Sequence, residues 1–132
     1  MSVFDSTTTV TMDMMVQDNY TSRICRVEGY QMIVTDHGTY AEVDFSGRFY
    51  DPDYGYVDLQ TTSTFLVNNS DEYPHSGVLV LTGETGTAGG PTRARLTALS
   101  STTCQVQADT DGDGYYDGVD DYDSGVILWT DL

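Results

Sequence analysis

The chain has 132 residues, a length that a single hydrophobic core can stabilise, and it contains ten Tyr, four Phe and one Trp. Its 21 acidic and five basic residues give a formal net charge of −16, and Lys is absent. Nucleic acids and anionic membrane surfaces are bound by clustered Lys and Arg, so we expect neither as a partner. We predict one folded domain over residues 1–132, with residues 1–5 loose.

Apolar and polar residues alternate along the chain, which is typical of β-strands with one buried face. The odd positions of residues 41–49 are apolar or small, and the even positions hold Glu, Asp, Ser and Arg. In chain order, strands are predicted at residues 9–16, 23–27, 31–35, 41–49, 57–67, 78–82, 94–99, 103–107 and 126–130. We expect a break at Gly29, a bulge near Ser63 and short antiparallel connections. The fold class is therefore all-β, an antiparallel β-sandwich or small β-barrel of eight or nine strands.

Cys25 and Cys104 lie in two different predicted strands, far apart in the sequence. A disulfide between them would add on the order of 4 kcal/mol by chain entropy. Two buried thiols are an equally open interpretation. A zinc site is not indicated, because the chain has neither a Cys-x-x-Cys pair nor a cluster of His. The sequence also has no apolar run of membrane-spanning length, so no membrane insertion is expected.

The most specific chemical feature is an Asp-rich run at residues 109–120, spaced Asp-x-Asp-x-Asp-Gly-x-x-Asp-x-x-Asp. Calcium is a hard cation that takes about six to eight oxygen ligands, and a calcium loop supplies them from positions 1, 3, 5, 7, 9 and 12. Those positions here are filled by Asp109, Asp111, Asp113, the Tyr115 carbonyl, Asp117 and Asp120. We predict Ca²⁺ as a cofactor, bound weakly because Asp replaces the usual longer Glu at position 12.

No helix is predicted on either side of this run, which distinguishes it from an EF-hand. It resembles the thrombospondin type 3 calcium repeats and their single-copy relatives in bacterial surface proteins. Residues 76–83, 94–99 and 128–132 also resemble a β-domain of uncharacterised bacterial secreted proteins and lipoproteins. These resemblances imply an extracytoplasmic location, whether secreted, periplasmic or at the cell surface. The chain differs from thrombospondin arrays in having one copy of the run.

The alternative interpretation of the run is an acidic hairpin turn without an ion, since Asp-Gly is a favoured turn pair. A turn needs only one such pair, whereas residues 109–123 contain seven Asp. Like charges crowded into one loop destabilise it unless a cation is present. This argument favours the calcium site.

The tyrosines form a second group of candidates. Tyr50, Tyr54 and Tyr56 flank an Asp-Pro-Asp turn, and Tyr115 and Tyr116 lie in the Asp-rich run. Exposed rings beside carboxylates suit sugar stacking, although Tyr more often packs at the edge of a core. With no catalytic motif evident, we expect a non-enzymatic structural or adhesive module. The alternative is a carbohydrate-binding module, with a glycan or another protein as the possible partner.

Overall fold

The computed structural model describes residues 6–17, 24–51, 55–117 and 121–132, so the segment 1–5 that we expected to be loose lies outside the described residues. Nine strands and one short 3-10 helix follow one another along the chain: β1 (Ser6–Gln17), β2 (Ile24–Asp36), β3 (Tyr40–Asp51), β4 (Gly55–Asn68), β5 (Ser76–Thr85), β6 (Pro91–Ala98), β7 (Thr103–Asp109), β8 (Tyr122–Asp123), β9 (Ile127–Leu128) and η1 (Trp129–Asp131).

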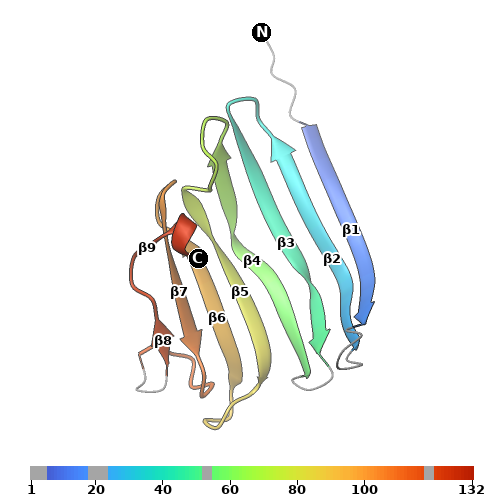
Figure 1. The fold of residues 1–132 in the computed structure, drawn as a ribbon, viewed down its shortest axis with the longest axis vertical. Helices are drawn as coiled ribbons and strands as arrows, with labels where there is room; N and C mark the ends of the chain where they lie inside the picture. Colours follow the sequence, from blue (N-terminus) through green and yellow to red (C-terminus); the bar gives the residue numbers. More distant parts are fainter. Residues whose placement is uncertain (1–5, 18–23, 52–54, 118–120) are drawn as a thin grey trace.

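The described strands form one open sheet in the order of the chain, from β1 to β8, with β9 paired to β7 (Figure 1). Every neighbouring pair is antiparallel, as the short connections predicted. The all-β class and the number of strands are thus confirmed. The choice between a sandwich and a small barrel stays open.

Besides β8, which was not predicted, two elements differ from the sequence prediction, and each has a local cause. The expected break at Gly29 is a bulge inside a continuous β2, where the pairing register shifts between Glu28 and Gln31. Gly29 adopts φ 58°, and its N–H donates to the Asp13 carboxylate of β1 at 2.6 Å. At the C-terminus the predicted strand 126–130 ends early, because the chain turns into η1 at Trp129. The predicted bulge near Ser63 is confirmed.

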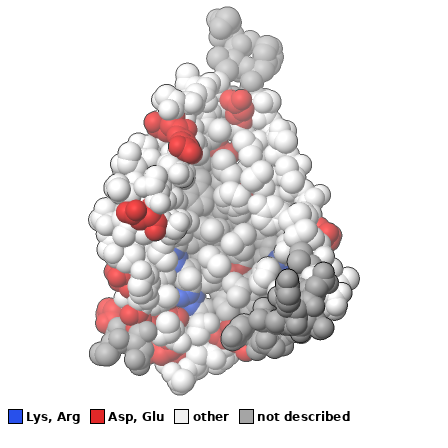
Figure 2. Space-filling view, in the orientation of Figure 1, with Lys and Arg blue, Asp and Glu red and all other residues white. Residues whose placement is uncertain are grey.

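Cross-strand pairing gives the sheet two chemically different faces, because directly paired residues project to the same side. One face, here called the apolar face, carries pairs such as Phe49–Val57, Leu59–Leu81 and Leu79–Leu96. The opposite, polar face carries pairs such as Arg48–Asp58 and Arg95–Gln107. Away from the strand ends, the described strand residues of the apolar face are uncharged. Figure 2 views this face: its upper middle is white and hollowed, acidic side chains lie mostly toward the margin, and Arg side chains show in the lower half.

The buried core lies on the apolar face, where η1 folds over β4 to β7 (Figure 1). Its buried members are Phe65, Ala98, Cys104 and Trp129. The Trp129 ring stacks on Tyr73 with centroids 5.6 Å apart, and its indole N–H donates to the Ser100 carbonyl at 3.1 Å. The C-terminal turn therefore covers one end of the face.

The two cysteines, for which the sequence left both a disulfide and two thiols open, lie far apart in the sheet. Cys25 lies in β2 and Cys104 in β7, with four strands between them, and no disulfide joins these two residues. Within the described part of the chain, no helix is long and apolar enough to cross a membrane.

Candidate metal centre

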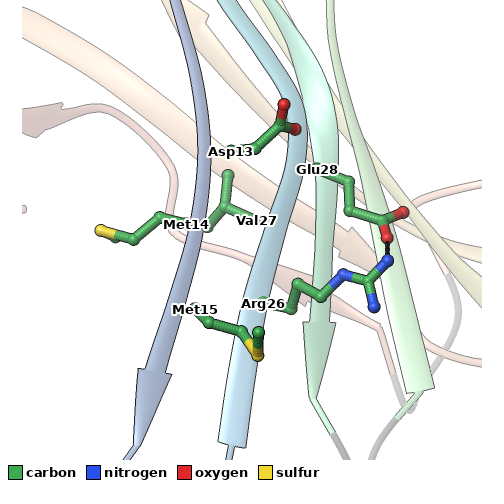
Figure 3. A pocket seen from close by; sticks show the side chains of 6 residues that line it. All are labelled: Asp13, Met14, Met15, Arg26, Val27 and Glu28. Carbon is green, nitrogen blue, oxygen red and sulfur yellow. Dashed lines mark ion pairs between the residues drawn. The ribbon is translucent and has the colours of Figure 1, made fainter.

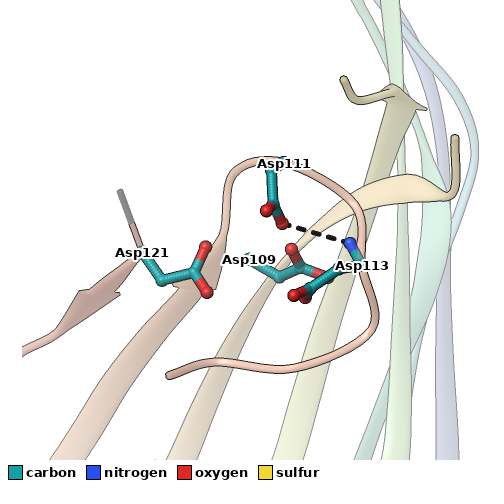
Figure 4. A group of neighbouring side chains, drawn as sticks. All are labelled: Asp109, Asp111, Asp113 and Asp121. Carbon is teal, nitrogen blue, oxygen red and sulfur yellow. Dashed lines mark hydrogen bonds between the residues drawn. The ribbon is translucent and has the colours of Figure 1, made fainter. Parts of the chain in front are cut away.

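The Asp-rich run begins where β7 ends, and four of its carboxylates converge. One oxygen each from Asp109, Asp111, Asp113 and Asp121 lies within 4.8 Å of the others. Figure 4 shows three of these side chains on the turn that leaves β7 and Asp121 on the segment that returns toward β8. The cluster therefore links the two ends of one loop.

The Asp-Gly-Asp-Gly sequence explains why the backbone curves around these side chains. Asp111 and Asp113 each accept the backbone N–H of the residue two positions later, at 3.1 and 2.8 Å, so each forms an Asx-turn. Gly112 and Gly114 supply φ values of 80° and 91°, which residues with a Cβ rarely adopt. Two successive tight turns result, and they bring alternate side chains to the inside of the loop.

Asp109 is the innermost member of the cluster, with 1% of its surface exposed. Each of its two carboxylate oxygens accepts one backbone N–H, from Gly112 and from Gly114, both at 2.8 Å. Burial raises the pKa of Asp109, but these N–H donors, the Asp111 carboxyl and the Asp113 N–H together outweigh it, and the net pKa is lowered. The folded loop therefore favours a negative charge at this position.

Asp111 has the opposite balance. The Asp113 backbone N–H lowers the pKa of Asp111, but burial, the neighbouring Asp109 carboxyl and the charges of Asp113 and Asp121 together raise it. The return segment is held close because the Thr110 N–H donates to Asp121 at 2.9 Å. The crowded carboxylates thus repel one another, and a cation placed among them would relieve that repulsion.

The loop is supported from outside by the turn between β5 and β6, residues 86–90. The Ala88 N–H donates to the Asp111 carbonyl at 2.8 Å, which ties the two turns together. A Cβ on Gly112 would lie 2.1 Å from the Gly90 carbonyl oxygen. Glycine on both sides therefore permits a backbone-to-backbone contact. The sequence did not reveal this contact.

The structure brings together three of the six predicted metal-ligating residues and adds one that sequence reasoning missed. Asp109, Asp111 and Asp113 meet in the cluster, whereas Asp117 is exposed and is not part of it. Tyr115, predicted to offer its carbonyl, has a side chain that is 66% exposed. Asp120 lies outside the described residues. Its neighbour Asp121 joins the cluster, and the adjacent Asp-Asp pair was the only signal that position 12 had a competitor.

The tyrosine candidates fall into two separate groups. Tyr50 and Tyr56 are paired across β3 and β4 on the polar face, with 45% and 42% of their surfaces exposed. With Arg26, Glu28 and Arg48 they line a cavity of about 310 Å³. Tyr115 and Tyr116 lie in the loop after β7, on the far side of β5 and β6. Tyr54 lies outside the described residues.

Each of the two groups has one tyrosine ring in contact with an arginine. The Arg48 guanidinium lies 4.0 Å from the Tyr56 ring centroid and is bonded to Asp58 at 2.7 and 3.1 Å. The Arg95 guanidinium lies 4.3 Å from the Tyr116 ring centroid. Tyr56 and Tyr116 therefore each present one ring face to a cation.

Comparisons with protein-family models, curated proteins and solved structures found no match to this chain.

Proposed function

We propose that the chain is a non-catalytic calcium-binding β module in which Ca²⁺ stabilises the connection between β7 and β8. The observation that carries this proposal is the convergence of four carboxylate oxygens to within 4.8 Å of one another. Oxygen ligands lie about 2.4 Å from Ca²⁺, so two on opposite sides of the ion are about 4.8 Å apart. One ion can thus contact Asp109, Asp111, Asp113 and Asp121 together.

The chemistry of the ligands favours Ca²⁺ over softer metals. Carboxylates are hard oxygen donors, and the cluster contains neither His nor Cys. An ion held by Asp109 and Asp121 would join the end of β7 to the segment that precedes β8. Its effect would be to stabilise this last hairpin, since the loop has strands rather than a pair of helices on either side.

The biological setting we propose is a structural or adhesive module of a bacterial extracytoplasmic protein. Calcium modules outside the cell bind the ion with Kd values of about 10⁻⁴–10⁻³ M, because free Ca²⁺ is abundant there. A loop built from short Asp side chains suits this weak range. The absence of Lys and the net charge of −16 are also compatible with a cation-rich setting.

Thermal unfolding in the presence of CaCl₂ or EDTA tests the proposal. Ca²⁺ that binds only the folded state adds about 2.7 kcal/mol to the free energy of unfolding at a hundredfold excess over Kd. The melting temperature should therefore rise with Ca²⁺ and fall with EDTA, and MgCl₂ at equal ionic strength serves as the control. Coincident melting curves in Ca²⁺ and EDTA would rule out the site.

A second candidate function, carbohydrate binding, is favoured by the cavity between Tyr50 and Tyr56. Two half-exposed rings beside Arg26, Glu28 and Arg48 combine a stacking surface with charged hydrogen-bonding groups. Screening the protein on a glycan array tests this candidate. Tyr50→Ala should abolish a specific signal, whereas Tyr115→Ala, in the other tyrosine group, should preserve it. A purely structural module gives no specific signal in either protein.

A further inference from the structure

Among the residues that the structure describes, the apolar face of the sheet is covered at one end and uncovered at the other. η1 and Tyr73 cover the part that includes Phe65 and Leu96. Over β1 to β4 the same face has a cavity of about 400 Å³, and Met12 and Phe49 in its lining are 38% and 45% exposed. We call this part the uncovered region; its other apolar lining residues are Val27, Tyr30 and Leu59, and Arg48 also lines the cavity. A sheet face of this composition normally packs against another layer.

The uncovered region combines adaptable apolar side chains with an acidic margin. Met12 and Met14 project from β1 on this face, and methionine adjusts to the shape of different partners because its thioether chain is flexible. Acidic side chains lie mostly toward the margin of this face (Figure 2), and Asp36 is the last residue of β2. An occupant should therefore be apolar in its middle and basic at its sides (Figure 2).

We propose that the uncovered region docks an amphipathic α-helix of a partner protein, with an apolar stripe flanked by Lys or Arg. Neighbouring strands lie about 4.8 Å apart, so β1 to β4 span about 14 Å, wide enough for a helix about 10 Å across. A second copy of this chain is disfavoured, because each copy carries a net charge of −16 and the acidic margins would meet. Anionic lipid is disfavoured by the same charge.

A designed peptide serves as the probe. It is an 18-residue helix of Leu and Lys with a single apolar face, labelled for fluorescence anisotropy and titrated with the protein in the presence of CaCl₂. A peptide with Glu in place of Lys controls for charge, and one with the same residues in scrambled order controls for the apolar stripe. We expect the Leu–Lys helix to bind and both controls to bind at least about tenfold more weakly.

Two neighbouring methionines provide matched variants of the protein. Met14 is paired with Val27 on the apolar face, whereas Met15 is paired with Arg26 on the polar face. Figure 3 shows their side chains leaving β1 in different directions. They are 42% and 69% exposed, so each accepts a polar side chain at little cost to folding. Met14→Asp should weaken peptide binding about tenfold, because it places a charge against the apolar stripe. Met15→Asp adds the same charge and should change the Kd less than about twofold.

Each other outcome overturns the proposal. Absent binding of the Leu–Lys helix would contradict the docking site, and equal affinity of both variants would reduce the interaction to non-specific charge attraction. A dimer in light scattering that Met14→Asp dissociates would assign the region to a second copy. Co-sedimentation with phosphatidylcholine vesicles that Met14→Asp removes would assign it to lipid. Circular dichroism and the melting temperature of each variant establish that it is folded.

Discussion

Two aspartates of the same loop, Asp111 and Asp117, differ sharply in their surroundings. Asp111 belongs to the four-carboxylate cluster, whereas Asp117 is exposed and outside it. A calcium loop read from sequence spacing gives both residues equal status as ligands. The structure therefore favours Asp111 over Asp117 as a ligand, and mutation of each residue can test this difference.

Asp111→Asn should lower the Ca²⁺ affinity about tenfold, equivalent to about 1.4 kcal/mol of binding free energy. The Asn side chain keeps an oxygen that can accept the Asp113 N–H, so the Asx-turn is retained while the charge is lost. Asp117→Asn, the matched control, should leave the affinity within about twofold, since surface charges far from the ion act weakly. Isothermal titration calorimetry measures both values. Equal losses of Ca²⁺ affinity in the two variants would mean that Asp117 is also a ligand, as the sequence predicted.

Asp58 provides a test of pH dependence away from the metal centre. Its hydrogen bond to Arg48 lowers the pKa of Asp58 in the folded protein. A lowered pKa contributes stability above the unfolded value of about 3.9, and this contribution is lost as the pH falls through the folded pKa. Asp58→Asn should thus be slightly less stable than the parent at pH 7, and the two should converge near pH 2. The effect is small because both side chains are nearly half exposed, at 46% and 45%.

Urea unfolding at a series of pH values measures this difference. Glu42→Gln is the control. Glu42 lies on the same face of β3 as Arg48, but its own partner is His37, 3.4 Å away. A stability gap between Asp58→Asn and the parent that persists unchanged at pH 2 would contradict the role of the ion pair.

At the scale of elements, the β5–β6 turn and the Asp-rich loop act as one unit. Gly112 touches the backbone of Gly90, and a Cβ there would lie 2.1 Å from that carbonyl oxygen. Gly114 has a similar positive φ, but no atom lies within 4 Å of its hypothetical Cβ. Both glycines are therefore needed for their positive φ, but only Gly112 is also needed for a close backbone contact.

Gly112→Ala should therefore destabilise the protein by about 1–3 kcal/mol more than Gly114→Ala, the usual cost of overpacking. Both substitutions share the penalty of a left-handed backbone, which cancels in the comparison. Chemical denaturation measures the difference directly. If the two variants were equally stable, the contact between the two turns would not contribute to folding.

Alternation along the chain was sufficient to predict most strands, because a sheet with one apolar face imposes a period of two residues. It was insufficient at Gly29, where a hydrogen bond to Asp13 of the neighbouring strand keeps β2 continuous. The spacing of Asp109, Asp111 and Asp113 predicted their convergence, since local turn geometry fixes it. Asp121 could not be chosen over Asp120 in the same way, because its position depends on the return path toward β8.

At the scale of the molecule, the sheet separates apolar residues to one face and charged residues to the other face and the margins. The pairing of β2 with β3 places Val27 opposite Phe49 and Glu28 opposite Arg48, and this division continues across the sheet. The net charge of −16 is thus concentrated on part of the surface. Such a charge destabilises the compact state through self-repulsion, independently of any ion bound in the loop.

A comparison of salts separates the screening of this global repulsion from specific Ca²⁺ binding in the loop. Raising NaCl from about 0.1 to 1 M shortens the Debye length from about 10 to 3 Å, so the melting temperature should rise gradually. Asp111→Asn should show the same NaCl response, because it changes the net charge by only one unit out of 16. Ca²⁺ should add a saturable increment above that from MgCl₂ at equal ionic strength, and Asp111→Asn should need about tenfold more Ca²⁺ than the parent to reach it. Differential scanning calorimetry over these salts distinguishes the two effects. A CaCl₂ response that matches MgCl₂ in both proteins would mean that screening accounts for all of the stabilisation.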